Sequence, residues 1–358
     1  MSPSKEEETK LDAFYRQMDK NYGQGAIFTP KFKPLPIEWI PTHIHSINGV
    51  WGKGIPRGRI IEIYGQEATG KTTLTLECVK SVQDAGFRVL FIDTEHALDP
   101  EYAKNLGVNL DDMPIAQPNS GEHALDMLQD AITSGLFGMV VVDSVDGCVP
   151  QSRLDGDSGD ANMASLAKLM SDCCRKIKGI CNTTKTTVLF TNQVRQKIGV
   201  FWGSPFFTSG GNALKYYASI RCEISKKETL MEGTKFVGIK SQLKVVKNKV
   251  APPFKIVMLS IMFGKGIDKG GDLKTHLMDE GRVERRGSNY YIDGDVRIGI
   301  GGAEADKWLA TEFTAYNDSL LDSKDEEKSK PKADAKPDTT PKKTELKKAD
   351  NKAKDKKK

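Results

Sequence analysis

The stretch Gly65-Gln66-Glu67-Ala68-Thr69-Gly70-Lys71-Thr72-Thr73 decides the fold of this chain. It directly follows an apolar run at residues 60–64 and opens a segment with helical periodicity at 71–85. The spacing G-x-x-x-x-G-K-[ST] between a strand and a helix predicts a phosphate-binding loop. Backbone N–H groups would face a phosphate at the helix amino end, Lys71 would approach the β and γ oxygens, and Thr72 would offer a hydroxyl to Mg²⁺. A simple glycine turn is the alternative, but the lysine, the hydroxyls and the flanking elements favour the phosphate loop.

The pattern around this loop predicts an α/β fold. Apolar runs without alternation, separated by helical patterns, indicate a mostly parallel sheet with helices on both faces. After residue 219 the runs alternate, which is typical of an antiparallel extension. The predicted strands are residues 60–64, 89–92, 139–142 and 187–191 in the parallel part and 219–225, 235–246 and 254–263 in the extension. The predicted helices are residues 8–22, 71–85, 99–106, 121–134, 163–181 and 210–217.

Composition divides the chain into four expected parts. Residues 324–358 hold 14 lysines against 8 acidic residues, so this segment accounts for more than the whole net charge of +5 and the rest of the chain is close to neutral, slightly negative. Such a segment cannot bury enough apolar area to offset its ordering entropy, so we expect a disordered tail. The expected parts are an N-terminal helix and connector at 1–40, a core at 41–267, a small α+β C-terminal domain at 268–318 and the lysine-rich tail at 319–358.

Apolar residues also bear on location and assembly. No apolar run approaches the roughly 20 residues of a membrane helix, and no signal peptide is visible, so we expect a cytoplasmic protein with no membrane partner. The six scattered cysteines are expected to be buried thiols. Leu11, Phe14, Tyr15, Met18 and Tyr22 form an apolar stripe on the first helix. This stripe either folds back on its own core or docks on another subunit.

Two further acidic positions complete the expected nucleotide site. An apolar run at residues 139–142 ends in Asp143, which would hold Mg²⁺ together with Thr72, in part through water. Another core strand is followed by Asp93 and Glu95, in the crevice where open α/β sheets bind ligands. Glu95 is the candidate to orient an attacking water, although Asp93 could fill that role or Glu95 could be a structural acid.

Several motifs in a fixed order resemble the bacterial RecA recombinases. They include Asp93-Thr-Glu95-His96-Ala-Leu-Asp99-Pro100-Glu-Tyr102, Val141-Val-Asp143-Ser144, Thr191-Asn192-Gln193-Val-Arg195-Gln-Lys197-Ile-Gly199, Gly210-Gly211-Asn212-Ala-Leu-Lys215 and Val245-Val-Lys247-Asn248-Lys249. The resemblance spans about residues 10–316 and implies a RecA-like P-loop ATPase core.

The resemblance also implies roles for individual residues of the ATP site. Residues 65–73 would hold the ATP phosphates, and Asp99 and Tyr102 would frame the adenine. Gln193 would sense the γ-phosphate, because an amide at a strand end can order the attached loop when ATP is present. Lys247 and Lys249 would reach the phosphates of a neighbouring subunit, although on sequence alone they could be exposed strand lysines.

Two segments resemble the loops that bind DNA, near residues 155–163 and 194–209. The second combines Arg195 and Lys197 with Trp202 and three phenylalanines, which suits backbone neutralisation and insertion between bases. A hydrophobic loop buried against the core is the alternative. The resemblance implies further DNA contacts by Met163, Arg175, Gly210, Gly211, Asn212 and Lys244. Lys168 and Ser171 are further candidates, because they lie off the apolar stripe of the predicted helix that carries Arg175.

The chain departs from the family pattern at several places. The tail is lysine-rich where the family usually carries an acidic one, and Gln242 replaces an arginine beside Lys244, with Lys240 as a potential substitute. The connector before the core is rich in proline and carries Trp39. The second loop ends in Phe206-Phe207-Thr208-Ser209 where the family has a polar run.

These observations together predict an ATP- and Mg²⁺-dependent homologous recombinase that forms a filament of its own copies on single-stranded DNA. It would exchange that strand into homologous duplex DNA and hydrolyse ATP in response to DNA, in repair and recombination. A single-strand-binding protein and loading mediators are further expected partners, in a bacterial cytoplasm or that of a phage-infected host. The alternatives are a filament-forming regulator that uses ATP only as a switch and a small-molecule P-loop kinase.

Overall fold

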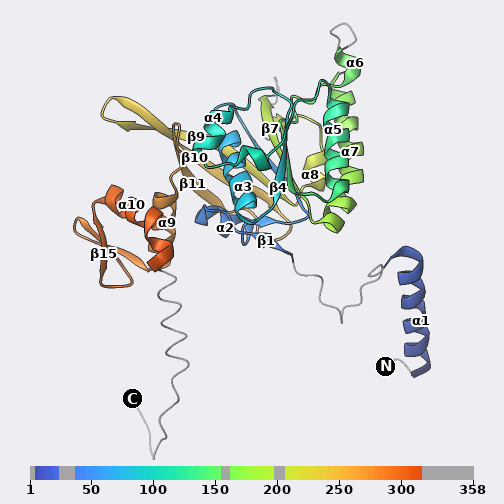
Figure 1. Cartoon of the computed structure of the whole chain (residues 1–358), viewed down its shortest axis with the longest axis horizontal. Helices are drawn as coiled ribbons and strands as arrows, with labels where there is room; N and C mark the ends of the chain where they lie inside the picture. The colour runs from blue at the N-terminus through green and yellow to red at the C-terminus, as the bar shows by residue number, and fades with distance from the viewer. Residues whose placement is uncertain (1–4, 24–36, 155–161, 197–205, 317–358) are drawn as a thin grey trace, which may run out of the picture. The chain divides into compact units, whose positions relative to one another are not determined.

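A computed structural model describes residues 5–23, 37–154, 162–196 and 206–316 (Figure 1). By their internal contacts the residues divide into two units, Met1–Ala310 and Thr311–Lys358. The sheet, the helices that cover it and the candidate site all belong to the first unit. All of the expected tail at 319–358, the centres of both expected DNA loops, and Lys197 and Trp202 lie outside the described residues.

The centre of the fold is a ten-stranded sheet with the order β12-β11-β10-β9-β3-β7-β6-β4-β5, in which β8 pairs with β7 off this path. The strands β9, β3, β7, β6, β4 and β5 run parallel. The apolar runs predict this for β3, β4, β6 and β7. The first part of β9 was expected in the antiparallel extension but pairs parallel with β3, and β5 was not predicted. The parallel strands are β3 (Ile60–Gly65), β4 (Arg88–Asp93), β5 (Ile115–Ala116), β6 (Phe137–Asp143), β7 (Thr187–Gln196) and β9 (Ile220–Glu232). Their carboxyl ends therefore meet at one edge, where the candidate site lies.

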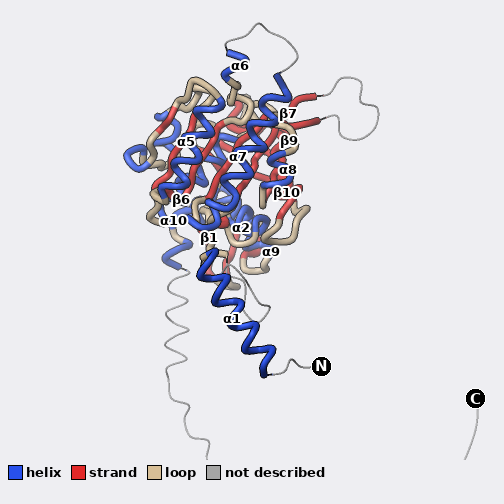
Figure 2. Tube along the Cα trace, turned by 90° about the vertical axis from the view of Figure 1, so that its right-hand side faces the viewer, coloured by secondary structure: helices blue, strands red, loops and turns tan. Residues whose placement is uncertain are grey.

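Helices cover both faces of this sheet. One apolar cluster joins the sheet to α2 (His45–Trp51), α3 (Lys71–Asp84) and α4 (Pro100–Asn105). A second cluster joins the opposite face to α5 (Gly121–Ser134), α7 (Asn162–Thr184) and α8 (Ala213–Tyr217). Figure 2 shows α5 and α7 side by side across that face. The predicted α/β core with helices on both faces is confirmed.

Antiparallel strands extend the sheet beyond β9, as the alternating runs predict. The long strands β9 and β10 (Lys235–Asn248) form a hairpin, followed by β11 (Ile256–Met262) and β12 (Gly266–Ile267). A small module then adds α9 (Lys269–Asp279), a sheet of β13 (Val283–Arg286), β14 (Asn289–Ile292) and β15 (Val296–Ile300), and α10 (Gly302–Thr311). The remaining elements are α1 (Lys5–Tyr22), β1 (Trp39–Ile40), β2 (Ile55–Pro56), the 3-10 helix η1 (Leu110–Asp112) and α6 (Gln151–Leu154).

Three further details differ from the sequence expectations. The helix expected at 210–217 begins only at Ala213, because Gly210 and Gly211 adopt φ values of +77° and +71°. The strand expected to end at residue 191 continues to Gln196 and pairs antiparallel with β8 (Phe206–Thr208). The loop expected at 194–209 therefore begins and ends as a paired segment, residues 194–196 with 206–208, here called the β7–β8 ribbon. Helix α2, with its buried Trp51, was not predicted.

The six cysteines are all free and buried, as expected. Burial raises the pKa of the Cys148 thiol to about 12, so it is a thiol at neutral pH. Among the described segments, no helix combines the length and the apolar character needed to cross a membrane.

The start of α5 supplies a first test of the fold. The buried Ser120 is its N-cap, and its hydroxyl accepts a hydrogen bond from the His123 N–H at 3.3 Å. Replacing Ser120 with alanine leaves this N–H without its partner, so we expect a loss of about 1 kcal/mol in the free energy of unfolding. Urea unfolding followed by circular dichroism measures the loss. The control Ser120→Thr keeps the hydroxyl and should retain most of the stability, and equal midpoints for wild type and Ser120→Ala would contradict the assignment.

Candidate active site

The phosphate loop lies where the sequence predicts it, between the end of β3 and the first residue of α3. The segment 65–73 turns through Ala68 and Gly70, whose φ values are +55° and +96°. Gly65 is required for a different reason, because a Cβ there would lie 2.1 Å from the Ile224 carbonyl oxygen. Since α3 begins at Lys71, the loop ends at a helix amino terminus, where unpaired N–H groups and the helix dipole favour an anion.

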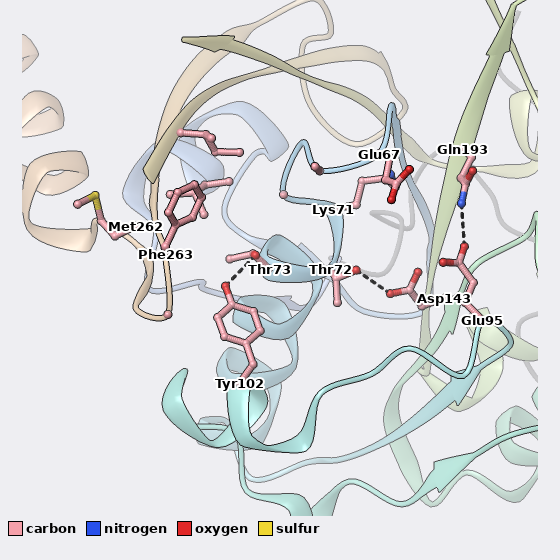
Figure 3. Close-up of a pocket in the computed structure, with 15 residues that line it drawn as sticks. Glu67, Lys71, Thr72, Thr73, Glu95, Tyr102, Asp143, Gln193, Met262 and Phe263 are labelled. Atoms are coloured by element: carbon pink, nitrogen blue, oxygen red, sulfur yellow. Dashed lines mark hydrogen bonds between the residues drawn. The ribbon is translucent and has the colours of Figure 1, made fainter. Parts of the chain in front are cut away.

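A cavity of about 380 Å³ opens beside this loop. Figure 3 shows the loop, the ends of the central strands and a turn of the antiparallel extension around it. The predicted residues that line it are Glu67, Ala68, Gly70, Lys71, Thr72, Thr73, Glu95, Tyr102, Asp143 and Gln193. The structure thus brings together residues from four separate stretches of sequence.

Lys71 points back onto its own loop. Its Nζ donates hydrogen bonds to the carbonyl oxygens of Gly65 at 3.1 Å and of Gln66 at 2.8 Å. Burial lowers the pKa of Lys71, and the nearby carboxylates of Asp143, Glu95 and Glu67 oppose that shift. An anion with more charge than these carbonyls would be a better partner for the ammonium group.

Asp143 and Thr72 meet as predicted. Thr72 Oγ1 donates a hydrogen bond to Asp143 Oδ2 at 3.0 Å, and the Thr191 hydroxyl donates to Asp143 Oδ1. Burial raises the pKa of Asp143, while the hydrogen bonds from Thr191 and Thr72 oppose the rise. One carboxylate and one hydroxyl at the cavity wall suit Mg²⁺, which takes few protein oxygens and completes its shell with phosphate and water.

Glu95 and Gln193 are hydrogen-bonded to each other. Gln193 Nε2 donates to Glu95 Oε1 at 3.0 Å (Figure 3). The Ser144 hydroxyl donates to the same oxygen. Asp93, the alternative candidate, is buried below the cavity, where it accepts hydrogen bonds from Ala97 N at 3.3 Å and from two further donors. The geometry therefore favours Glu95 over Asp93 as the residue that faces a ligand.

Asp99 and Tyr102 have different positions. Asp99 is the N-cap of α4, and its Oδ1 accepts from Glu101 N at 2.9 Å and Tyr102 N at 3.1 Å. Tyr102 lines the cavity, and its hydroxyl lies 2.9 Å from Thr73 Oγ1. Burial raises the pKa of Tyr102, so the phenol is neutral at physiological pH.

Sequence reasoning missed one wall of the cavity. Apolar residues of the antiparallel extension form it: Ile239, Ile261, Met262, Phe263 and Gly264. The Phe263 side chain is 55% exposed and stands opposite Tyr102 across the cavity (Figure 3). The alternating strand pattern predicts this strand, but no motif marks the turn after it as part of the site.

Lys247 and Lys249 do not line the cavity. Their Nζ atoms donate to the Tyr216 carbonyl oxygen at 3.0 and 3.1 Å, and Lys247 also donates to Lys215 O. This position at the end of β10 is compatible with a role toward another subunit. That role remains a prediction.

Lys247 supplies a pH-dependent test. Burial, with the neighbouring Lys249 and Arg221 charges, lowers the pKa of Lys247 to about 8. In the absence of nucleotide its amine should therefore be half neutral near that pH. Competitive labelling with acetic anhydride, quantified by mass spectrometry from neutral to alkaline pH, should give a midpoint near 8. A midpoint near the ordinary value of 10.5 would contradict this environment.

The expected DNA-binding residues fall into groups. Gly210, Gly211 and Asn212 precede α8, and Lys244 is exposed on β10. Lys240, the potential substitute for the missing arginine, lies 3.1 Å from Glu228 Oε1. The residues expected on α7 are Met163, Lys168, Ser171 and Arg175, and Arg175 lies 3.3 Å from Asp172.

Arg195, at the start of the β7–β8 ribbon, is held by an acid that sequence reasoning did not single out. Asp146 accepts two hydrogen bonds from Arg195 Nη2, at 2.9 and 2.7 Å, and one from Nε at 3.1 Å. It also accepts one from the Ser209 hydroxyl. Asp146 therefore contacts the first strand of the ribbon, through Arg195, and the residue directly after its second strand, Ser209.

A buried polar network below the site was also missed. Asn192 Nδ2 donates to Glu62 Oε1 and to Ser209 O, each at 3.0 Å, and Arg221 forms an ion pair with Glu62. Gln193 N donates to Asn192 Oδ1 at 2.9 Å. The network joins three central strands to Ser209, the residue directly after the ribbon, so β7 is fixed up to Asn192, immediately before Gln193.

Comparison with known proteins supports the motif-based expectation. Residues 9–268 match the family model described as RecA N-terminal domain. Proteins named Protein RecA from Streptomyces avermitilis, Streptomyces rimosus and Enterococcus hirae are 45%, 46% and 44% identical to this chain over 84% of it. The matches cover 80%, 81% and 87% of those proteins. The chain belongs to the RecA family.

Proposed function

We propose that the cavity beside the phosphate loop binds ATP with Mg²⁺, and that Glu95 orients the water that attacks the γ-phosphate. Residues 65–73 would surround the phosphates, Lys71 would leave its carbonyl partners for phosphate oxygens, and Thr72 with Asp143 would hold Mg²⁺. The metal would neutralise charge on the phosphates. Tyr102 and Phe263 border the end of the cavity away from Glu95, where a base would fit, with Asp99 holding the start of α4.

The activity follows from family membership. The chain is an ATP-dependent recombinase that acts in DNA recombination and repair, with DNA-dependent ATPase activity, DNA binding and assembly with its own copies. We further propose that the filament forms on single-stranded DNA in the cytoplasm and pairs it with homologous duplex DNA. Lys247 and Lys249 would reach the neighbouring subunit's nucleotide, and a single-strand-binding protein and loading mediators would assist.

One observation carries the proposed coupling between ATP and DNA, namely the Gln193–Glu95 hydrogen bond of 3.0 Å at the cavity edge. Gln193 lies on β7, two residues before Arg195 and the rest of the ribbon. A γ-phosphate would offer the amide a more strongly charged acceptor than Glu95 does. Exchange of partners would move the strand end and would free Glu95 to orient water, so one event would change both the ribbon and the catalytic carboxylate.

A substitution of Gln193 tests this coupling. Gln193→Ala should not lower DNA-independent ATP hydrolysis, because it leaves Glu95 free to orient water, but it should lose most of the stimulation by single-stranded DNA, about tenfold or more. It should also fail to exchange a circular single strand into a homologous linear duplex. Gln129→Ala, on α5, is the control and should behave as wild type. Normal strand exchange by Gln193→Ala would contradict the proposed coupling.

The two alternative functions predict other results. A regulator that uses ATP only as a switch would bind DNA without strand exchange by the wild-type chain. A small-molecule kinase would phosphorylate an acceptor and would not respond to DNA. Membership of the RecA family favours neither alternative.

A further inference from the structure

Asp146 is placed to act on both the DNA-binding ribbon and the nucleotide site. It lies in the turn that follows β6, three residues after Asp143 and two after Ser144. Its carboxylate accepts three hydrogen bonds from the Arg195 guanidinium, between 2.7 and 3.1 Å, and one from the Ser209 hydroxyl. No motif of the sequence marks this position.

The charge state of this pair is well defined. Burial alone would raise the pKa of Asp146, but the hydrogen bonds from Arg195 and Ser209 outweigh burial and lower it. The carboxylate is therefore ionised at neutral pH. The Asp146 side chain is 17% exposed, whereas the Arg195 side chain is 58% exposed. The guanidinium is therefore within reach of an anion in solution that could take the place of Asp146.

The two partners of Asp146 differ in their freedom to move. Asn192 Nδ2 donates a hydrogen bond to the Ser209 carbonyl oxygen at 3.0 Å. The next residue, Gly210, is closely packed, because a Cβ there would lie 2.9 Å from Val145 Cγ1. A Cβ on Gly211 would lie 2.7 Å from the Ala167 Cβ. The segment from Ser209 to Gly211, directly after the ribbon, is therefore fixed against the core. The exposed Arg195 is the partner that can leave.

The same turn touches the nucleotide site through Ser144. The Ser144 hydroxyl donates to Glu95, which also accepts from Gln193. Gln193 and Arg195 lie two residues apart on β7, so their side chains project from the same face of the strand. A shift of this strand end would therefore change both the Gln193–Glu95 and the Arg195–Asp146 contacts.

We propose that Asp146 is a positioning residue that occupies Arg195 in place of a DNA phosphate until nucleotide and DNA are bound. A carboxylate binds a guanidinium in the same two-pronged geometry as a phosphate does, so the two anions compete for Arg195. Competition lowers DNA affinity most when no nucleotide is present to move the strand. The inference rests on the proposed role of Arg195 in DNA binding.

Asp146→Asn removes the competing charge and retains the size of the side chain. Fluorescence anisotropy of a labelled oligothymidine should show its affinity without nucleotide to be about three to ten times that of wild type. The affinity with a non-hydrolysable ATP analogue should change little, so the nucleotide-dependent gain should shrink. The salt dependence of nucleotide-free binding should steepen by about 0.7 in log–log slope, the value for one added phosphate contact on a single strand. Asp130→Asn, an exposed acid on α5, controls for the charge change.

The double variant with Arg195→Gln separates the ways in which the proposal can fail. Arg195→Gln alone should weaken binding in the presence of the analogue, and it should abolish the effect of Asp146→Asn. If Arg195→Gln weakens binding but Asp146→Asn leaves nucleotide-free affinity unchanged or reduced, the role of Asp146 is overturned and DNA binding by Arg195 stands. The role of Asp146 is also overturned if Asp146→Asn changes DNA affinity equally in the wild-type chain and in the Arg195→Gln variant. If Arg195→Gln binds DNA as wild type does, the DNA role of Arg195 fails and this proposal fails with it.

Discussion

Replacing Lys71 with alanine is expected to lower kcat/KM for ATP hydrolysis by about 10³-fold, because a preorganised charge at the phosphates is lost. Lys71 is the cation at the start of α3, and its partners in the structure are uncharged carbonyl oxygens of the loop at 2.8 and 3.1 Å. No other side chain in the loop, residues 65–73, carries positive charge. DNA binding that depends on ATP should be lost as well.

Lys80→Ala is the matched control for Lys71→Ala. Lys80 lies on the same helix, and its ammonium group pairs with Asp84 outside the cavity. Lys80→Ala should hydrolyse ATP within about twofold of the wild-type rate, because Lys80 does not line the cavity and loss of its ion pair changes stability little. Steady-state phosphate release measures both variants, and circular dichroism verifies their folding. Hydrolysis by Lys71→Ala above one tenth of the wild-type rate would contradict the assignment.

Glu95→Gln is expected to lower kcat for ATP hydrolysis by about 10²- to 10⁴-fold while ATP-dependent DNA binding remains. The amide keeps the shape of the side chain and can still accept from Gln193 and Ser144, but it cannot take a proton from water. Since the nucleotide is bound but not consumed, the complex with single-stranded DNA should live longer than that of wild type. Single-turnover hydrolysis and filter binding measure the two effects.

Two controls make this second prediction specific. Glu101→Gln, an exposed carboxylate on α4 near the same cavity, should hydrolyse ATP at nearly the wild-type rate. Asp93→Asn tests the alternative base, and it should reduce stability more than catalysis because Asp93 accepts hydrogen bonds from Ala97 N and Leu98 N. Normal turnover by Glu95→Gln together with an inactive, folded Asp93→Asn would reverse the assignment.

Much of the fold is predictable from local patterns. The helix 121–134 has the predicted bounds, and the strands β3, β4 and β6 lie within one or two residues of their expected bounds. These segments carry their signal in consecutive residues, as unbroken apolar runs or a periodic stripe. The extension of β7 to Gln196 was not predictable in this way, because it depends on pairing with β8, residues 206–208, which begins ten positions further along the chain. Helix α2 has too few residues for a clear period.

The site residues also differ in how far the sequence predicts them. The phosphate loop, Asp143 and Glu95 are predictable because a recognisable spacing or a strand end marks each of them. Phe263, Asp146 and the Glu62–Arg221 pair carry no such mark. Their roles arise from contacts between residues that are distant in sequence, such as Asp146 and Arg195, 49 positions apart. The sequence shows the chemistry of these side chains but not their partners.

The central claim is that ATP binding in the cavity is coupled to DNA binding by the β7–β8 ribbon. It is tested most directly by measuring ATP hydrolysis with and without long single-stranded DNA. The measurement uses the purified full chain at two salt concentrations, beside Lys71→Ala and Gln193→Ala. The account predicts strong stimulation by DNA for wild type, weaker at high salt, absent in Lys71→Ala and largely lost in Gln193→Ala. Hydrolysis by wild type that is indifferent to DNA would contradict it.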